Sequence, residues 1–383
     1  MRKSIPFLKP NLVKKETYMK YLDVIDETRI YSNYGNLNTQ FEKRILSEYF
    51  QNKGAVSTVS NATIGLMLSI MLSKRKKGRY AIMPSFTFSA TAQAALWCGL
   101  EPLFIDIRSK DWCMDEKLVQ NYVDKLGEEI AVIVPYATFG TVVDLSYYQN
   151  LMELGVPVVV DAAASFGSTY DGLGLEATFS GPIVYSFHAT KAFGIGEGGL
   201  VYSQDEAFIE QLRKAGNFGF GPNRNSEQIG LNSKLTEYAA AIGLASLDKY
   251  PEKILIRQEI RRKYEKSMKE VGLFDHGWQL HLTRGNVAHQ NVSVLSPDDC
   301  NAIDVVSFLE QSGIEARTYF SPACHQQSLF LNSNKSIMET TENIARRIIN
   351  LPLWEEISDQ EIDFVVGQLR LFQSKQKEVI INS

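Results

Sequence analysis

The sequence predicts an α/β fold in which a mostly parallel central sheet carries helices on both faces, followed by a smaller α+β domain. Two observations predict this arrangement. Short apolar segments rich in β-branched residues alternate with helical segments, which is the pattern of βαβ units. Beyond Leu247 the pattern changes, because a long charged helix leads into a shorter mixture of strands and helices. We therefore predict a large domain with an N-terminal arm over residues 1–250 and a small domain over residues 251–383.

The individual elements follow from apolar periodicity and from the turn residues between them. In chain order we expect helices near residues 11–30, 39–49, 64–72, 89–97, 115–126, 251–272, 302–312 and 359–374, and strands near residues 56–60, 80–83, 103–107, 131–134, 156–160, 183–185 and 292–294. A loop over residues 31–37, rich in turn formers and aromatic residues, separates the first two helices.

Composition indicates a globular protein with a small partner. Of the 383 residues, 44% are apolar and 22% are charged, and 40 basic against 44 acidic residues give a formal net charge of −4. Because no long run of one sign occurs, we expect no nucleic-acid or membrane partner. No segment could span a bilayer, and the first ten residues lack the apolar core of a signal peptide.

The cysteines support the same expectation. They are scattered without a Cys-x-x-Cys pair or metal-ligand spacing, at Cys98, Cys113, Cys300 and Cys324. We expect reduced thiols, no metal site and a cytoplasmic location.

A phosphate site is indicated where the strand near residues 56–60 meets the next helix. Ser60, Asn61 and Thr63 can cap that helix, whose first turn offers free backbone N–H groups, a positive dipole end and a hydroxyl. The alternative is that these residues are helix caps and nothing more, as in most such sequences.

Two further candidates follow predicted strands. Phe88 lies near a strand's carboxyl end, where an aromatic ring can stack on a flat cofactor or simply pack in the core. Asp161 directly ends the most apolar strand, and a carboxylate there needs a cationic or N–H partner, such as a protonated pyridine nitrogen. Its alternative role is an ordinary helix cap.

A lysine motif supplies the reactive group. The strand near residues 183–185 runs into Ser186-Phe187-His188-Ala189-Thr190-Lys191 and then a glycine-rich segment. Phe187 and Phe193 can desolvate Lys191 and lower the pKa of its ammonium, which a covalent bond to an aldehyde cofactor requires. Taken alone, Lys191 could be a surface loop residue. Together with the phosphate, stacking and carboxylate candidates, it matches the needs of pyridoxal 5'-phosphate.

In their order and in their residues, these motifs resemble those of the DegT/DnrJ/EryC1/StrS family of sugar aminotransferases, which have the type I fold of pyridoxal-phosphate enzymes. The resemblance covers nearly the whole chain. It rests on residues 59–63, 84–92, 161–163, 186–191 with 196–199, and 230–232 with Glu237 and 240–244. It implies that Lys191 binds the cofactor covalently and moves the proton, and that Asp161 pairs with the pyridine nitrogen. It also assigns cofactor contacts to Ala62, Thr63, Phe88 and Ser186, and to Asn232 reaching across a homodimer.

The resemblance further implies that L-glutamate donates the amino group and a nucleotide-linked ketosugar accepts it. Candidate substrate contacts are Tyr31, Asn33, Lys234, Arg317, Tyr319 and His325. Two residues depart from the family pattern: Ala164 stands where many members have Gln or His, and Lys234 where many have Arg. These departures put ring tuning and substrate contacts in doubt, because alanine offers no hydrogen bond and lysine no bidentate pair.

Residues 135–140 and 161–167 look most like members that aminate C4 of dTDP-4-keto-6-deoxyglucose for surface polysaccharide or other glycoconjugates. The alternatives are a 3-keto-sugar aminotransferase, a sugar dehydratase on the same scaffold, and a non-catalytic ligand sensor. Dehydratases of this kind have histidine at the lysine position, so Lys191 argues against that alternative.

Overall fold

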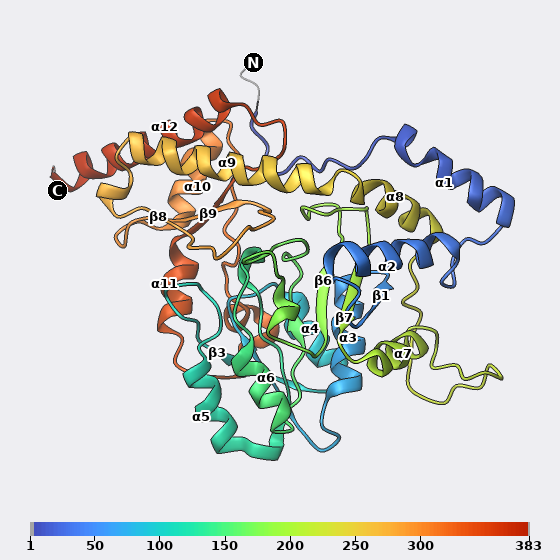
Figure 1. Cartoon of the computed structure of the whole chain (residues 1–383). Helices are drawn as coiled ribbons and strands as arrows, with labels where there is room; N and C mark the ends of the chain where they lie inside the picture. Colours follow the sequence, from blue (N-terminus) through green and yellow to red (C-terminus); the bar gives the residue numbers. More distant parts are fainter. Residues whose placement is uncertain (1–3, 382–383) are drawn as a thin grey trace.

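A computed structural model describes residues 4–381, so the outermost three N-terminal and two C-terminal residues of the predicted domains lie outside the described residues. Figure 1 shows a large domain built around a sheet and a smaller domain in which two long helices, α9 (Tyr250–Glu270) and α12 (Asp359–Ile381), run side by side. Among the described helices, none is long and apolar enough to cross a membrane.

The central sheet has the strand order β1-β7-β6-β5-β4-β2-β3-β10. Two four-stranded halves are joined by parallel bridges from Ile133 to Val158 and from Tyr136 to Asp161. Every neighbouring pair is parallel except those that include β7, which is antiparallel to both β1 and β6. The strands are β1 (Ala55–Val59), β2 (Tyr80–Pro84), β3 (Glu101–Ile105), β4 (Ile130–Ile133), β5 (Val160–Asp161), β6 (Ile183–Ser186), β7 (Gly199–Ser203) and β10 (Asn334–Lys335).

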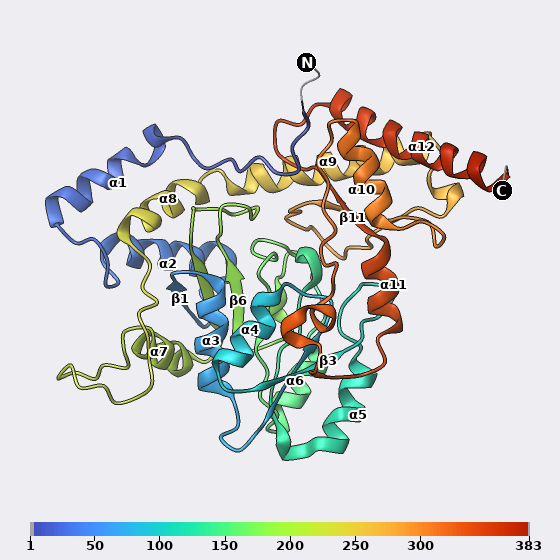
Figure 2. The ribbon, with the colours of Figure 1, turned by 180° about the vertical axis from the view of Figure 1, so that it is seen from behind.

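Helices cover both faces of this sheet, which confirms the predicted architecture (Figure 2). Side chains alternate between the faces, so Ile82 packs into one core cluster while its neighbours Ala81 and Met83 pack into the other. One face carries α3 (Ala62–Ser73), α4 (Ser89–Trp97) and α7 (Glu206–Ala215); the other carries α2 (Asn36–Tyr49), α5 (Glu116–Leu126), α6 (Ser146–Glu153) and α8 (Glu237–Leu247).

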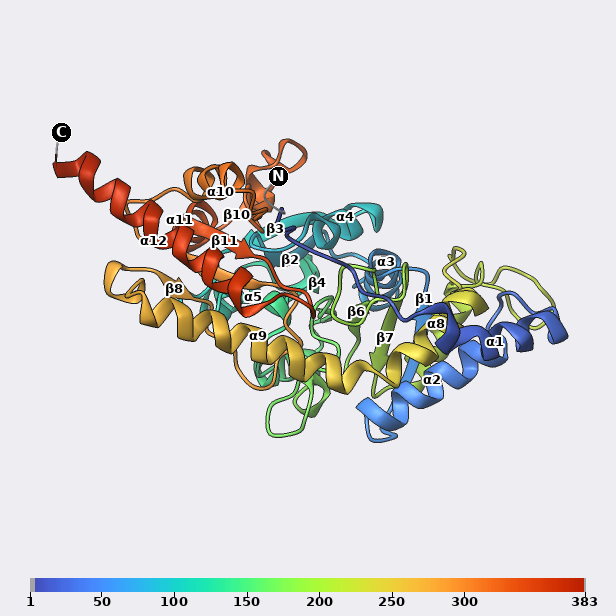
Figure 3. The same ribbon diagram turned by 90° about the horizontal axis from the view of Figure 1, so that it is seen from above.

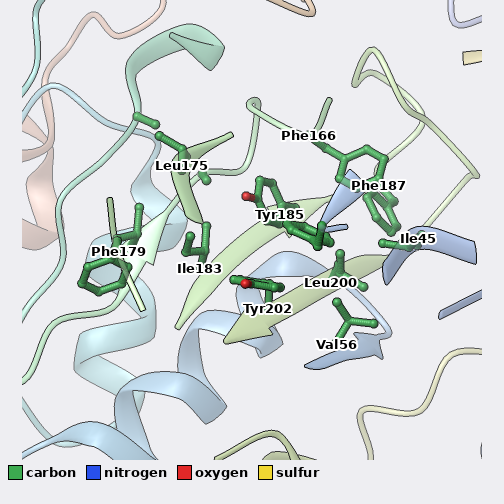
Figure 4. Close-up of a cluster of buried hydrophobic side chains, with 14 of the residues drawn as sticks. Ile45, Val56, Phe166, Leu175, Phe179, Ile183, Tyr185, Phe187, Leu200 and Tyr202 are labelled. Atoms are coloured by element: carbon green, nitrogen blue, oxygen red, sulfur yellow. The ribbon is translucent and has the colours of Figure 1, made fainter. Parts of the chain in front are cut away.

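The core beneath α2 is rich in aromatic side chains. Figure 4 shows Ile45 of α2 and Val56 of β1 beside Leu200 and Tyr202 of β7. Phe187, directly after β6, is fully buried in the same cluster. This packing fixes the end of β6, from which the lysine motif departs.

The small domain has an antiparallel sheet of order β11-β9-β8 covered by helices. Its elements are α9 (Tyr250–Glu270), β8 (Gln279–Leu280), β9 (Val292–Leu295), α10 (Ala302–Gln311), α11 (Glu339–Arg347), β11 (Ile348–Leu351) and α12 (Asp359–Ile381). From above, α9 and α12 lie at one end of the molecule, and α2, α8 and α1 (Lys15–Thr28) lie at the other (Figure 3).

The domain boundary near residue 250 stays a prediction. On each side of it, some residues pack into the other domain. Ile5 forms a parallel bridge with Ile314 and belongs to the small-domain core. In the other direction, β10 adds to the edge of the large sheet, and Cys324 and Phe330 pack into a large-domain core cluster.

Some predicted elements have different limits in the structure. The strand expected over residues 156–160 reduces to Val160–Asp161, with Val158 contributing a single bridge. Pro157 interrupts the ladder because it has no N–H to donate, although its carbonyl oxygen accepts from the Ile133 amide at 2.8 Å. The four cysteines are buried and free.

Candidate active site

A cavity of about 650 Å³ lies where the strand ends of the large domain meet segments of the small domain. This is the position that open α/β sheets use for ligands. Its walls combine the start of α3, the residues after β5 and β6, and two small-domain segments. The lining residues include Asn61, Ala62, Thr63, Phe88, Tyr136, Phe139, Asp161, Ser186, His188, Thr190, Lys191, Glu197, Gln290, Asn291, Tyr319 and Phe320.

Asp161 is a buried carboxylate, only 3% exposed, on the wall of this cavity. Its Oδ2 accepts from Thr91 Oγ1 at 2.6 Å, and its Oδ1 accepts from the Ala163 amide at 3.1 Å. Burial raises the pKa of Asp161, while these two hydrogen bonds and the nearby Lys191 ammonium lower it. A cationic group in the cavity would therefore stabilise the charged form.

Lys191 faces the same cavity from the loop after β6. Its Nζ donates to Gln290 Oε1 at 3.2 Å, and burial lowers the pKa of its ammonium against the opposing effect of Asp161. A lysine so placed has a larger fraction of neutral amine near neutral pH than an exposed lysine. The structure thus argues against the alternative that Lys191 is an ordinary surface lysine in a loop.

The glycine-rich segment closes the loop that carries Lys191. The Ala189 amide donates to Gly196 O at 2.7 Å, and the Ile195 amide donates to Phe187 O at 2.9 Å. A Cβ on Gly194 would lie 2.8 Å from the Ala189 carbonyl oxygen, so the close approach requires glycine. The loop is thereby held in one conformation.

The start of α3 lines the cavity and offers groups that could bind an anion. Asn61 Oδ1 accepts from the Ile64 amide at 3.0 Å, while the amides of Ala62 and Thr63 belong to the first turn, where a helix provides no acceptor. The hydroxyl of buried Ser186 lies at the end of β6 and accepts from the His188 amide at 3.3 Å. Together these groups suit a phosphate.

Phe88 lies at the rim and is 61% exposed, which excludes a core-packing role. Its ring centroid is 6.5 Å from that of Phe320, which itself lines the cavity. The side chain is free to cover a flat ligand.

Five of the predicted residues lie outside this cavity within one chain. Asn232 is exposed and bridges to Asn217, and Lys234 donates to Asn217 Oδ1 at 3.0 Å. Tyr31 stacks on Tyr238 with ring centroids 6.3 Å apart. The other two are Asn33, which has a positive φ of 66°, and Arg317, which lies over the Phe7 ring. Tyr319 does line the cavity.

His325 is a sixth predicted residue outside the cavity lining. It is 2% exposed, with Nδ1 2.6 Å from Ser85 Oγ and Nε2 3.1 Å from Glu342 Oε1. These partners make it a structural link between the end of β2 and α11.

Sequence reasoning missed several cavity residues. Tyr136 and Phe139 follow β4, so the strand-end rule could have identified them. Gln290 and Asn291 come from the small domain, and no local pattern announces their contact with the lysine loop. Thr91 was missed because its partner Asp161 is 70 residues away.

The residues present fit pyridoxal 5'-phosphate. A buried carboxylate suits its ring nitrogen, a desolvated primary amine suits its aldehyde, the start of α3 suits its phosphate, and Phe88 suits its ring face. Among the described residues, no group of His, Cys, Asp and Glu could hold a metal ion.

Comparison with known proteins identifies the family of this chain. The model of the DegT/DnrJ/EryC1/StrS aminotransferase family matches residues 13–370. The chain belongs to this family. It is a pyridoxal-phosphate-dependent sugar aminotransferase with the type I fold.

Solved structures of similar proteins superpose over almost the entire chain. A Bacillus cereus protein assigned as a PLP-dependent aminotransferase is 48% identical with a TM-score of 0.94, covering 96% of this chain and 100% of its own. DesI, crystallised in the presence of its TDP-sugar product, is 29% identical with a TM-score of 0.90, covering 100% and 96%.

Curated relatives of this family member include Protein MT3510 of Mycobacterium tuberculosis, 32% identical, covering 96% of this chain and 89% of its own. The dTDP-4-amino-4,6-dideoxy-D-glucose transaminase of Shigella dysenteriae is 26% identical, covering 97% and 99%.

Proposed function

We propose that this aminotransferase moves the amino group of L-glutamate to C4 of dTDP-4-keto-6-deoxy-D-glucose, giving dTDP-4-amino-4,6-dideoxy-D-glucose for surface polysaccharide or another glycoconjugate. The observation that carries amino transfer is that Lys191 and Asp161 line the same cavity. Asp161 ends β5, and Lys191 lies in the loop after the adjacent parallel strand β6. The choice of sugar substrate is supported by the Shigella relative, by the TDP-sugar product of DesI, and by the sequences of residues 135–140 and 161–167.

When bound, pyridoxal phosphate supplies an electron sink for breaking the Cα–H bond of the donor and for the reverse step on the ketosugar. Asp161 holds a proton at the ring nitrogen, because its buried carboxylate is stabilised by a cation there. Lys191 Nζ is the group that binds the cofactor and, once released, takes and returns the proton.

The remaining residues position and enclose the reactants. The amides of Ala62 and Thr63 and the Ser186 hydroxyl bind the phosphate. Tyr319 and Phe320 cover the cavity from the small-domain side and restrict water. Ala164 has no side-chain hydrogen-bonding group, so it would supply no hydrogen bond to the cofactor's phenolic oxygen.

A homodimer completes the site in this proposal. Asn232 and Lys234 lie outside the cavity of their own chain, so they act in the site of a second copy. Helix α8 buries most of its apolar residues within its own chain. The contact surface therefore uses exposed side chains around it, such as Tyr31 and Tyr238.

The remaining proposed substrate contacts differ in how close they lie to the cavity. Tyr319 reaches the cavity directly, and Arg317 lies two residues before it with a guanidinium that can bind a phosphate or carboxylate. Tyr31 and Asn33 belong to the loop before α2 and act only across the dimer.

The deciding experiment is NMR of the product formed from dTDP-4-keto-6-deoxyglucose and L-glutamate by the purified enzyme. Nitrogen at C4 supports the proposal, and nitrogen at C3, or turnover only with a 3-keto isomer, makes it a 3-keto-sugar aminotransferase. Loss of a sugar hydroxyl group without amino transfer would indicate a dehydratase. Cofactor binding without turnover of any ketosugar in a panel of dTDP, GDP and UDP sugars would indicate a ligand sensor.

A further inference from the structure

Two threonine hydroxyls form a chain that ends on Asp161. Thr91 Oγ1 lies 2.6 Å from Asp161 Oδ2, and Thr87 Oγ1 lies 3.0 Å from Thr91 Oγ1. Both threonines are fully buried, and neither is among the residues that line the described cavity. The chain therefore acts on the carboxylate without touching the cofactor or the substrate.

The order of donors in this chain is fixed by the carboxylate. An ionised carboxylate only accepts, so Thr91 directs its single proton to Asp161 and accepts from Thr87 in turn. A threonine within a helix ordinarily gives this proton to a backbone carbonyl three or four residues earlier. In α4 the proton goes instead to β5, so the contact is a tertiary link between two elements.

The surroundings of Asp161 have opposing effects on its ionisation. Burial favours the neutral acid, while the Thr91 hydroxyl and the Ala163 amide favour the anion by donating to separate oxygens. Thr91 also belongs to the first turn of α4, whose positive dipole end favours a nearby negative charge. Removing the Thr91 hydroxyl would leave the effect of burial on the pKa of Asp161 less opposed, so the neutral acid would be favoured more.

We infer that Thr91, ordered by Thr87, is a positioning residue that keeps Asp161 ionised and aimed at the ring nitrogen of the cofactor. The inference rests on the role proposed for Asp161. The proton shared by the carboxylate and the pyridine nitrogen stays on the nitrogen, because the hydroxyl stabilises the carboxylate that has given it up. No proton is gained or lost in this arrangement.

The test compares two ligands in the apoenzyme, pyridoxal 5'-phosphate and its 1-deaza analogue, in which a CH group replaces the ring nitrogen. Thr91→Val keeps the side-chain shape and removes the hydroxyl. We expect it to weaken binding of pyridoxal phosphate about 10- to 100-fold relative to the analogue, since a hydrogen bond to a charged group is lost. Thr91→Ser restores the preference, and Thr87→Val reduces it by a smaller factor.

Equal weakening of both ligands by Thr91→Val would show a merely structural role and would overturn the inference. The inference would also be overturned if Thr91→Val left the ratio of the two ligand affinities unchanged while Asp161→Asn abolished the preference for pyridoxal phosphate. That result would leave the proposed role of Asp161 intact. An unchanged ratio in Asp161→Asn would overturn both. If Thr91→Val does not fold, Thr87→Val decides, because it leaves Thr91 in place and an unchanged ratio there contradicts the ordered chain.

Discussion

Nζ of Lys191 donates a hydrogen bond to Oε1 of Gln290, a residue that lies two positions before β9 of the small domain. The amine proposed to do the chemistry thus has a partner outside the domain that carries it. A shift of the small domain would change the surroundings of this amine, so the small domain can influence the reaction as well as enclose it.

Lys191→Ala should fold and lose all turnover, because among the residues that the structure describes no other amine lines the cavity and could take its place. Borohydride reduction of the wild-type enzyme followed by peptide mapping should find the cofactor on Lys191. The adduct should persist in Lys234→Ala, whose amine lies outside the cavity. A reduced adduct on a different lysine would refute the assignment.

Asp161→Asn should lower kcat by orders of magnitude while the cofactor still binds, since an amide does not stabilise a protonated pyridine nitrogen. Phe88→Ala is the milder comparison. It should weaken cofactor binding by about 1 kcal/mol, the contribution of a stacked ring beyond its buried area, and preserve the chemistry. Near-normal turnover of Asp161→Asn would remove the carboxylate from the mechanism.

Gly199→Ala should weaken cofactor binding at least about tenfold, because its new Cβ would lie 2.8 Å from the Ala62 amide nitrogen and displace the start of α3. Gly367→Ala is the matched control. It has open space around it on α12 and should leave cofactor binding unchanged while adding about 0.5–1 kcal/mol of stability. Equal cofactor affinity in both variants would place the phosphate elsewhere.

Acid should destabilise the protein through His281. This residue is 2% exposed, its Nδ1 has no hydrogen-bond partner, and burial lowers its pKa to about 4. The unfolded chain takes up this proton near pH 6.5 and the folded chain only near pH 4, so stability falls as the pH drops through that window. The loss from this residue is about 3 kcal/mol.

Urea unfolding at several pH values between 7 and 4 measures this effect. His281→Gln should give a shallower decline of the unfolding free energy, although His289, whose pKa burial lowers to about 3, keeps part of the slope. An identical pH dependence in His281→Gln and wild type would exclude His281 as a source of the acid sensitivity.

Mixing an inactive Lys191→Ala chain with an inactive Asn232→Ala chain should restore partial activity, because one of the two sites in the heterodimer would then have both native residues. Each variant alone is the control. Verified heterodimers without activity, or an active monomer in sedimentation experiments, would contradict the shared site.

The sequence predicted the elements and residues that depend on local pattern. Asp161 and Lys191 were found because each follows an apolar strand, and parallel strands deliver their ends to one edge of a sheet. The link from Thr91 to Asp161 was not predictable, since it joins α4 to β5 through tertiary packing. The same holds for Gln290, which reaches Lys191 only because the small domain folds back over the large one.

Strand β10 was missed for a related reason. Asn334 and Lys335 are polar and exposed. They count as a strand only because these two residues pair with β3. Their position is set by the edge of β3, more than 200 residues earlier, so no local signal marks them.

The late position of β10 has a consequence for synthesis of the protein. The edge of the large sheet and part of its core, including Cys324 and Phe330, come from the last fifth of the chain. A nascent chain that has just completed residue 250 therefore exposes apolar surface on β3 and α4 that only residues translated much later will cover. Until those residues leave the ribosome, we expect this surface to be open to chaperone binding, and truncation before residue 324 should yield aggregated protein.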